Sequence, residues 1–161
     1  MGAVVLDASI VLGILDPHDA HHLSAAESVR TARSAGHALV LPASAFAELL
    51  VGASRVGPTA VAKTEAFVDS LIDQVYPIDR VVAKDAARLR SQSKAVRLPD
   101  ALVVAVGRVI NATANITADA LEGGDGCWCT RSMSPLGPCG RTRAPLFAPQ
   151  GVGRIRVQAQ R

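Results

Sequence analysis

Four acidic residues occupy positions from which they could act together on one substrate. Asp7 and Asp119 each closely follow a short apolar run, Glu48 interrupts a longer apolar segment, and Asp100 directly precedes another. Clustered carboxylates bind hard divalent cations, and Mg²⁺ prefers a few carboxylates together with several waters. An all-oxygen donor set favours Mg²⁺ or Mn²⁺ over zinc. Such a site polarises a phosphoryl oxygen and activates water, so the pattern predicts metal-assisted chemistry on a phosphoryl group.

Each of these acids also has an ordinary structural role open to it. Asp7 could cap the helix that follows it, and Asp100 would be stabilised by its place at a helix N-terminus. Asp119 could be a turn residue. The apolar neighbours of Glu48 predict that it is partly buried, and a local arginine could then offset the cost of burying its charge. A shared cation is the one explanation that covers all four positions.

The elements that would position these acids alternate along the first 120 residues. Short apolar runs bounded by Pro, Gly or Asp predict strands, and apolar residues at helical spacing predict helices. Asp19 and Asp79 are the expected N-caps of the second and fifth helices. The expected strands are 4–6, 38–41, 75–78 and 112–116, and the expected helices are 9–15, 19–35, 44–53, 59–73, 79–92 and 98–110.

This alternation predicts an α/β fold in three layers, α/β/α, around a central parallel sheet of four to five strands. Val4, Val5 and Leu6 form a strand that is apolar throughout, which is typical of a strand buried on both faces. Ligand sites of such sheets lie at the carboxyl ends of the strands. Asp7 and Asp119 are therefore expected at the same edge of the sheet.

Composition and charge divide the chain into a domain at 1–120 and an atypical tail at 121–161. With 49% apolar residues the chain can bury a core. The domain carries 11 Lys and Arg against 12 Asp and Glu, a net charge of −1, whereas the tail carries six Arg against two acids, a net charge of +4. The basic character thus belongs to the tail, and the net charge of the domain offers no argument for a nucleic-acid partner.

The tail is rich in Gly, Pro and Arg, and only its final alternating segment at 153–158 predicts a strand. Most of residues 121–150 are expected to be poorly ordered. All three cysteines lie there, without a fourth ligand nearby, so a zinc site is not expected. No apolar run approaches the ~18 residues of a membrane span, and no secretory signal is evident, which predicts a cytoplasmic protein without a membrane partner.

Four motifs in correct order and spacing resemble the PIN domain family, and most closely its VapC-type toxins from bacterial toxin–antitoxin pairs. The resemblance covers residues 3–119. It rests on the segments Val4-Val5-Leu6-Asp7-Ala8-Ser9, Ala45-Phe46-Ala47-Glu48-Leu49-Leu50, Arg97-Leu98-Pro99-Asp100-Ala101 and Ile116-Thr117-Ala118-Asp119. The sequence departs from the family after its last acid, because about 30 loop-like residues precede the segment that could supply the final strand.

The resemblance implies a metal-dependent endoribonuclease that hydrolyses RNA phosphodiester bonds as the toxic component of its pair. It implies that Asp7 and Asp100 are the main Mg²⁺ ligands, with Mn²⁺ as an alternative ion, and that Glu48 and Asp119 complete the site. Ser9 and Thr117 match supporting hydroxyl positions beside the first and last acids. A protein antitoxin and a second copy of the chain, in a homodimer, are the expected protein partners.

Two other hypotheses remain open from the sequence. A catalytically weak or inactive PIN-like protein would act only by binding its antitoxin. A phosphatase that uses Asp7 as nucleophile is the third, but that class usually has a second Asp two residues later, where this chain has Ser9. His18, His21 and His22 cluster after the first helix, where a solvated loop is favoured over a metal site.

Overall fold

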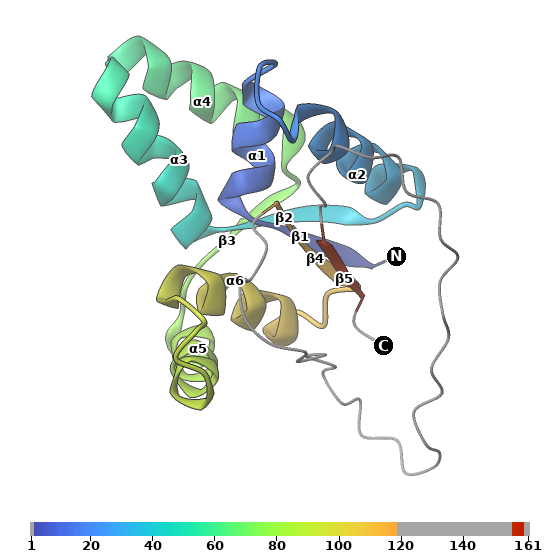
Figure 1. Ribbon diagram of the computed structural model, residues 1–161, viewed down its shortest axis with the longest axis vertical. Helices are drawn as coiled ribbons and strands as arrows, with labels where there is room; N and C mark the ends of the chain where they lie inside the picture. Colours follow the sequence, from blue (N-terminus) through green and yellow to red (C-terminus); the bar gives the residue numbers. More distant parts are fainter. Residues whose placement is uncertain (1, 119–155, 160–161) are drawn as a thin grey trace.

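The computed structural model describes residues 2–118 and 156–159, which form six helices and five strands (Figure 1). In chain order they are β1 Ala3–Leu6, α1 Ala8–Leu15, α2 His22–Ser34, β2 Ala38–Pro42, α3 Ala43–Val56, α4 Pro58–Leu71, β3 Gln74–Tyr76, α5 Arg80–Gln92, α6 Leu98–Val109, β4 Ala114–Thr117 and β5 Arg156–Ala159. The element order predicted from the sequence is confirmed over residues 2–118. No helix among the described residues is both long and apolar enough to cross a bilayer.

The five strands form one sheet in the order β3-β2-β1-β4-β5. The first four are parallel, and β1 lies between β2 and β4, with Val5 opposite Val40 on one side and Asn115 on the other. β5 is antiparallel to β4 and closes the far edge, with Val157 opposite Ile116. β3 is the other edge strand, and Pro77 follows directly after it, in agreement with the reluctance of proline to enter a sheet interior.

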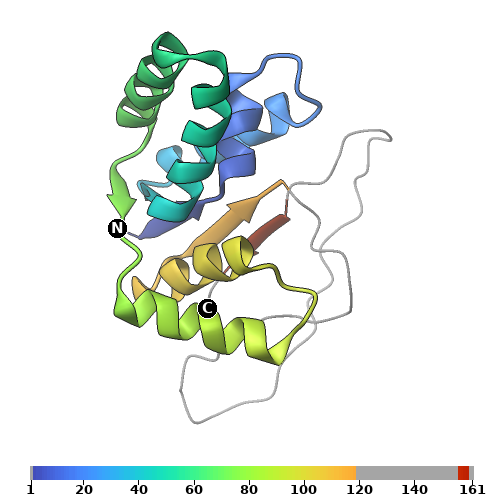
Figure 2. The ribbon, with the colours of Figure 1, turned by 90° about the vertical axis from the view of Figure 1, so that its left-hand side faces the viewer.

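The sheet is covered on both faces, which confirms the three-layer α/β/α arrangement (Figure 2). Side chains of β1 alternate between the two sides, because successive residues of a strand point to opposite faces. Val4 and Leu6 pack with α1–α4, whereas Val5 packs with α5 and α6. All three are at most 3% exposed, so β1 is the buried central strand that its sequence predicts.

The N-cap predicted from the sequence is confirmed for α5 but not for α2. Asp79 is the N-cap of α5, and its Oδ1 accepts hydrogen bonds from the backbone N–H groups of Val81 and Val82. The prediction that Asp19 caps the second helix is wrong. α2 begins at His22, and Asp19 instead accepts a hydrogen bond from the His21 N–H in the turn before the helix. The Asp19 carboxylate therefore stabilises the backbone of the turn at 16–21.

The predicted tail falls largely outside the described residues. This applies to Asp119, to the loop expected at 121–150 and to the three cysteines. The described part of the tail is β5, which overlaps the segment at 153–158 that the sequence predicts as the final strand.

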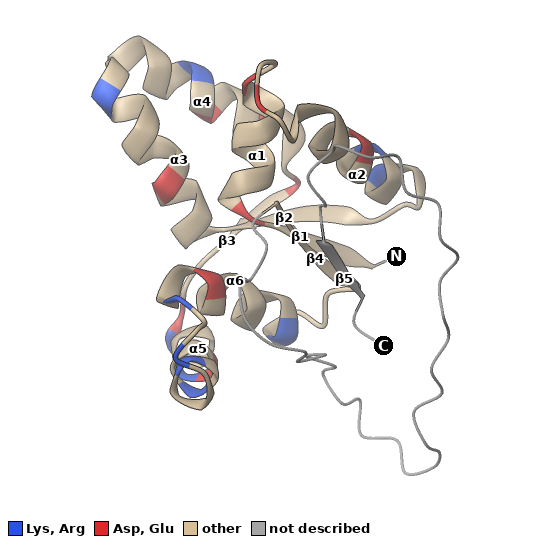
Figure 3. Ribbon diagram, viewed as in Figure 1, with Lys and Arg blue, Asp and Glu red and all other residues tan. Residues whose placement is uncertain are grey.

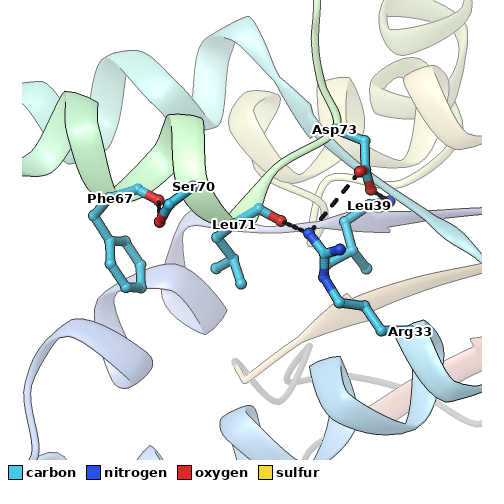
Figure 4. Close-up of polar contacts among 6 residues, drawn as sticks. All are labelled: Arg33, Leu39, Phe67, Ser70, Leu71 and Asp73. Carbon is cyan, nitrogen blue, oxygen red and sulfur yellow. Dashed lines mark hydrogen bonds and ion pairs between the residues drawn. The ribbon is translucent and has the colours of Figure 1, made fainter.

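A carboxylate ties the end of α4 to the second strand (Figure 4). Asp73 Oδ2 accepts a hydrogen bond of 2.7 Å from the backbone N–H of Leu39, and the Asp73 N–H donates to the Leu39 carbonyl oxygen at 2.9 Å. Arg33 of α2 adds a hydrogen bond to the Leu71 carbonyl oxygen and an ion pair to Asp73 at 3.9 Å. Leu39 is fully buried. Two helices of one layer, α2 and α4, and strand β2 of the sheet therefore meet at Asp73.

Asp73→Ala is expected to lower the free energy of unfolding by about 1–3 kcal/mol, because it leaves the buried Leu39 N–H without its acceptor. The measurement is urea unfolding followed by circular dichroism. Asp69→Ala, at an exposed position of α4, is the matched control and is expected to change stability by less than about 0.5 kcal/mol. Equal stability of the two variants would contradict the assigned role of Asp73.

Candidate metal-dependent active site

Asp7 lies where β1 ends and α1 begins, at the carboxyl edge of the parallel strands. Its backbone is extended, with φ −86° and ψ 161°, and its N–H donates to the Ile116 carbonyl oxygen of β4 at 3.0 Å. Its Oδ1 accepts a hydrogen bond of 2.8 Å from the Ala8 N–H, so Asp7 is the N-cap of α1. The capping role considered from the sequence is therefore real, and it fixes the carboxylate at the edge of the sheet.

Two hydroxyls from different elements hold the other oxygen of Asp7. Ser9 Oγ and Thr117 Oγ1 each donate to Asp7 Oδ2 at 3.0 Å, and the two hydroxyl oxygens lie 3.5 Å apart. The Ala118 N–H donates to Ser9 Oγ at 3.1 Å. Thr117 is 110 residues from Asp7 in sequence. The pairing of β4 with β1 thus brings the two expected hydroxyls onto the first acid.

Glu48 and Asp100 come from the two helices that border this edge. Glu48 lies near the middle of α3, and Asp100 lies half-buried in the first turn of α6. α3 packs against both α1 and α6, and Figure 3 marks the acidic residues of these helices in red. The structure therefore brings the elements that carry Asp7, Glu48 and Asp100 together at one end of the sheet.

The prediction that Glu48 is partly buried is wrong. Glu48 is exposed, whereas Ala45 and Leu49 carry the buried side of α3. Helical geometry explains the difference, because residues 45 and 49 are four apart and share one face, and residue 48 is rotated away from the centre of that face. Apolar neighbours in sequence do not imply apolar neighbours in space on a helix.

The donors at this edge suit a hard cation. The ionised carboxylate of Asp7 offers about four lone-pair positions; the three hydrogen bonds above occupy one on Oδ1 and two on Oδ2, which leaves Oδ1 able to accept once more. Within residues 2–118 and 156–159, no group of three or more His, Cys, Asp or Glu side chains could hold a metal ion. Mg²⁺ commonly binds proteins through only one or two carboxylates and keeps its waters, so a magnesium site at this edge would need only one or two of these acids.

The clustered histidines have local contacts. A ring nitrogen of His22, Nδ1, lies 2.9 Å from the Gly13 carbonyl oxygen, and the His21 backbone N–H binds Asp19. The first contact joins the start of α2 to α1, and the second lies within the turn at 16–21.

The net charge of the domain conceals a local concentration of positive charge. Seven of the eleven Lys and Arg residues in 2–118 lie between residues 80 and 108, on α5, on the segment leading to α6, and on α6 itself. Figure 3 shows the blue positions gathered there. This cluster of basic residues is visible in the sequence when charge is counted segment by segment, but the net charge of the whole domain does not reveal it.

Comparisons with known proteins give one family and several similar structures. The model of the PIN domain family matches residues 4–120. A Mycobacterium tuberculosis structure, VapC20, described as a sarcin-ricin loop cleaving toxin, has 16% sequence identity and a TM-score of 0.57, over 70% of this chain and 87% of that one. A toxin–antitoxin complex from Klebsiella pneumoniae has 19% identity and a TM-score of 0.57, over 73% and 87% of the two chains.

The third similar structure is VapBC2 from Rickettsia felis, bound to a DNA fragment from its promoter. It has 15% identity and a TM-score of 0.56, over 73% of this chain and 87% of that one. At these identities the likeness concerns the fold. No curated protein matches the chain in sequence.

Proposed function

Because the chain belongs to the PIN domain family, we propose that it is a metal-dependent endoribonuclease and the toxic component of a toxin–antitoxin pair. The observation that carries the proposal is the anchoring of Asp7 at the carboxyl edge of the sheet by the hydroxyls of Ser9 and Thr117. A carboxylate held by three hydrogen bonds keeps one orientation, which is the preorganisation that a site for a cation requires.

In this proposal, Asp7 and Asp100 hold Mg²⁺, or Mn²⁺ in its place, and Glu48 and Asp119 complete the acidic set. When bound there, the ion supplies charge stabilisation at the phosphoryl oxygen and activation of water. Ser9 and Thr117 orient Asp7. Glu48, exposed on α3, would take part directly or through a metal-bound water.

An antitoxin partner is the second part of the proposal. Two of the similar structures are toxin–antitoxin assemblies, and the layer formed by α1–α4 exposes several large apolar side chains. Leu23 on α2 and Val56 on α3 are 80% and 82% exposed, and Leu12 and Leu15 of α1 and Val51 of α3 are 46%, 36% and 54% exposed. A protein that covered this layer would remove these side chains from water. We also propose a homodimer.

The competing hypothesis is a PIN-like protein that binds its antitoxin without cutting RNA. Its support is the departure of the sequence from the family after Asp119. RNA cleavage separates the two hypotheses directly.

Purified protein incubated with a mixture of RNA oligonucleotides is expected to cleave them in the presence of Mg²⁺ and to stop when EDTA is added, because chelation removes the ion from the carboxylates. Re-addition of Mg²⁺ should restore cleavage. Gel analysis of the products measures the result, and the Asp100→Asn variant is the control for contaminating nucleases. Cleavage that persists in EDTA, or that is equal in Asp100→Asn, would refute the metal-dependent mechanism.

A further inference from the structure

Charge is separated within the described part of the domain. Residues 79–108 hold seven basic and three acidic side chains, a net charge of +4, whereas the remainder of 2–118 holds four basic and eight acidic side chains, a net charge of −4. The two totals cancel, but the charges lie on different layers. α5 and α6 cover one face of the sheet, and α1–α4 cover the other (Figure 2).

Six exposed cations lie on α5 and on the segment that joins it to α6, and together they make up the basic face of the domain. They are Arg80, Lys84, Arg88, Arg90, Lys94 and Arg97. α5 buries Val82, Ala86 and Leu89 against the core, so its other side faces water. Arg80, Lys84 and Arg88 follow one another at intervals of four residues, which places a cation about every 6 Å along the helix axis.

Few of these cations are neutralised by a carboxylate. Asp85 pairs with Arg88 at 2.8 Å and with Arg108 of α6 at 3.3 Å. Arg80, Lys84, Arg90, Lys94 and Arg97 have no ion pair with any other described residue. A group of unpaired like charges is unfavourable in the isolated protein and becomes favourable when a polyanion binds it.

The basic face leads to the acidic site. Arg97 is the N-cap of α6, and Asp100 lies in the first turn of the same helix. A strand of regularly spaced phosphates that lay along α5 and the joining segment would therefore arrive at the carboxylates, which repel phosphate unless a cation is present. A row of positive charge that runs along α5 toward the site suits the evenly charged backbone of a single-stranded nucleic acid.

We propose that the basic face binds the phosphates of the RNA strand that flanks the cleaved bond. The proposal rests on the endoribonuclease function proposed above, and it adds where the substrate lies. Arg90, Lys94 and Arg97, the cations nearest to Asp100 in sequence, contact the phosphates closest to the site. Arg80 and Lys84 contact phosphates further along the strand.

The test compares two triple variants with equal changes of charge. One is Arg90→Gln, Lys94→Gln and Arg97→Gln on the basic face; the matched control is Arg30→Gln, Arg55→Gln and Lys63→Gln on α2, α3 and α4. Both are made in the Asp7→Asn background, in which cleavage is expected to be at least about 100-fold slower, so that binding is measured on intact RNA. Fluorescence anisotropy of a labelled single-stranded RNA oligonucleotide gives Kd at several salt concentrations, and thermal unfolding verifies that both variants are folded.

Loss of three phosphate contacts is expected to weaken RNA binding about 10-fold at low salt and to reduce the slope of log Kd against log salt by about 2. The control triple variant is expected to keep both values. In the otherwise unaltered chain, the basic-face triple variant should raise KM for RNA and leave kcat within about two-fold, because the carboxylates are untouched.

Unchanged RNA affinity and salt slope would overturn the proposal, and so would an equal loss in the control variant. Binding of poly-glutamate that is lost in the basic-face variant, with RNA binding retained, would also overturn it in favour of an acidic protein partner. RNA binding that depends on the basic face in a protein that never cleaves RNA would support the docking surface and refute the proposed enzymatic function. The two failures are therefore distinguishable.

Discussion

An Asp7→Asn variant is expected to cleave RNA about 100-fold more slowly than the unaltered chain, or slower still. The amide keeps an oxygen that can accept the hydrogen bond of the Ala8 N–H, and the hydroxyls of Ser9 and Thr117 can rotate to meet the new NH₂ group. The cap of α1 therefore survives, whereas the negative charge that would hold the cation is lost. Initial rates of cleavage at saturating Mg²⁺ measure the effect.

The comparison needs a control for both charge and stability. Asp69→Asn makes the same chemical change on the exposed side of α4 and is expected to leave the rate within about two-fold. The two variants should unfold within a few degrees of each other. If Asp7→Asn retained the full rate, Asp7 would be a helix cap alone, and the proposed site would lose its central member.

Gly107→Ala is expected to lower the free energy of unfolding by about 1–3 kcal/mol, the usual cost of overpacking a core. A Cβ atom added at Gly107 in α6 would collide with Oδ1 of Asn115 and lie 2.8 Å from both its Cγ and its Nδ2. Asn115 lies in β4 and is 6% exposed, so its side chain has little room to move. Chemical denaturation with urea measures the loss.

A second substitution isolates the cause. Asn115→Ala removes the atoms that the new methyl group meets, so Gly107→Ala should cost less in that background than alone. Gly52→Ala in α3 is the matched control, because a Cβ there meets nothing within 4 Å; it is expected to stabilise the protein by up to about 1 kcal/mol. A loss in Gly107→Ala that is unchanged by Asn115→Ala would show that the two residues do not compete for space.

Much of the fold followed from short-range chemistry that is visible in the sequence. The Asp79 carboxylate accepts hydrogen bonds from the N–H groups two and three residues later. Gly36, which follows the C-cap residue of α2, adopts φ 74°. Three successive apolar residues, Val4, Val5 and Leu6, are typical of a strand covered on both faces. These effects act within a few residues, so they can be recognised without knowing what else is nearby.

A local sequence pattern does not fix which residues become neighbours in space. The apolar residues next to Glu48 suggested burial, but the helix turns its side chain to the exposed side. Asp19 resembled a helix cap, yet its carboxylate serves the preceding turn. The basic face is hidden in the net charge of the domain, because opposite charges elsewhere cancel it in the sum, although the two sets lie on opposite faces of the sheet.

The sequence by itself determined the order of the elements and the candidate acids, because capping, periodicity and turn formation are local. Only the tertiary structure decided that the Thr117 hydroxyl binds Asp7 across 110 residues, that Asn115 occupies the space above Gly107, and that Asp73 supplies the acceptor for Leu39. These contacts depend on strand register and helix packing. A shift of one residue in register would turn every side chain of β4 to the other face and separate Asp7 from its hydroxyl.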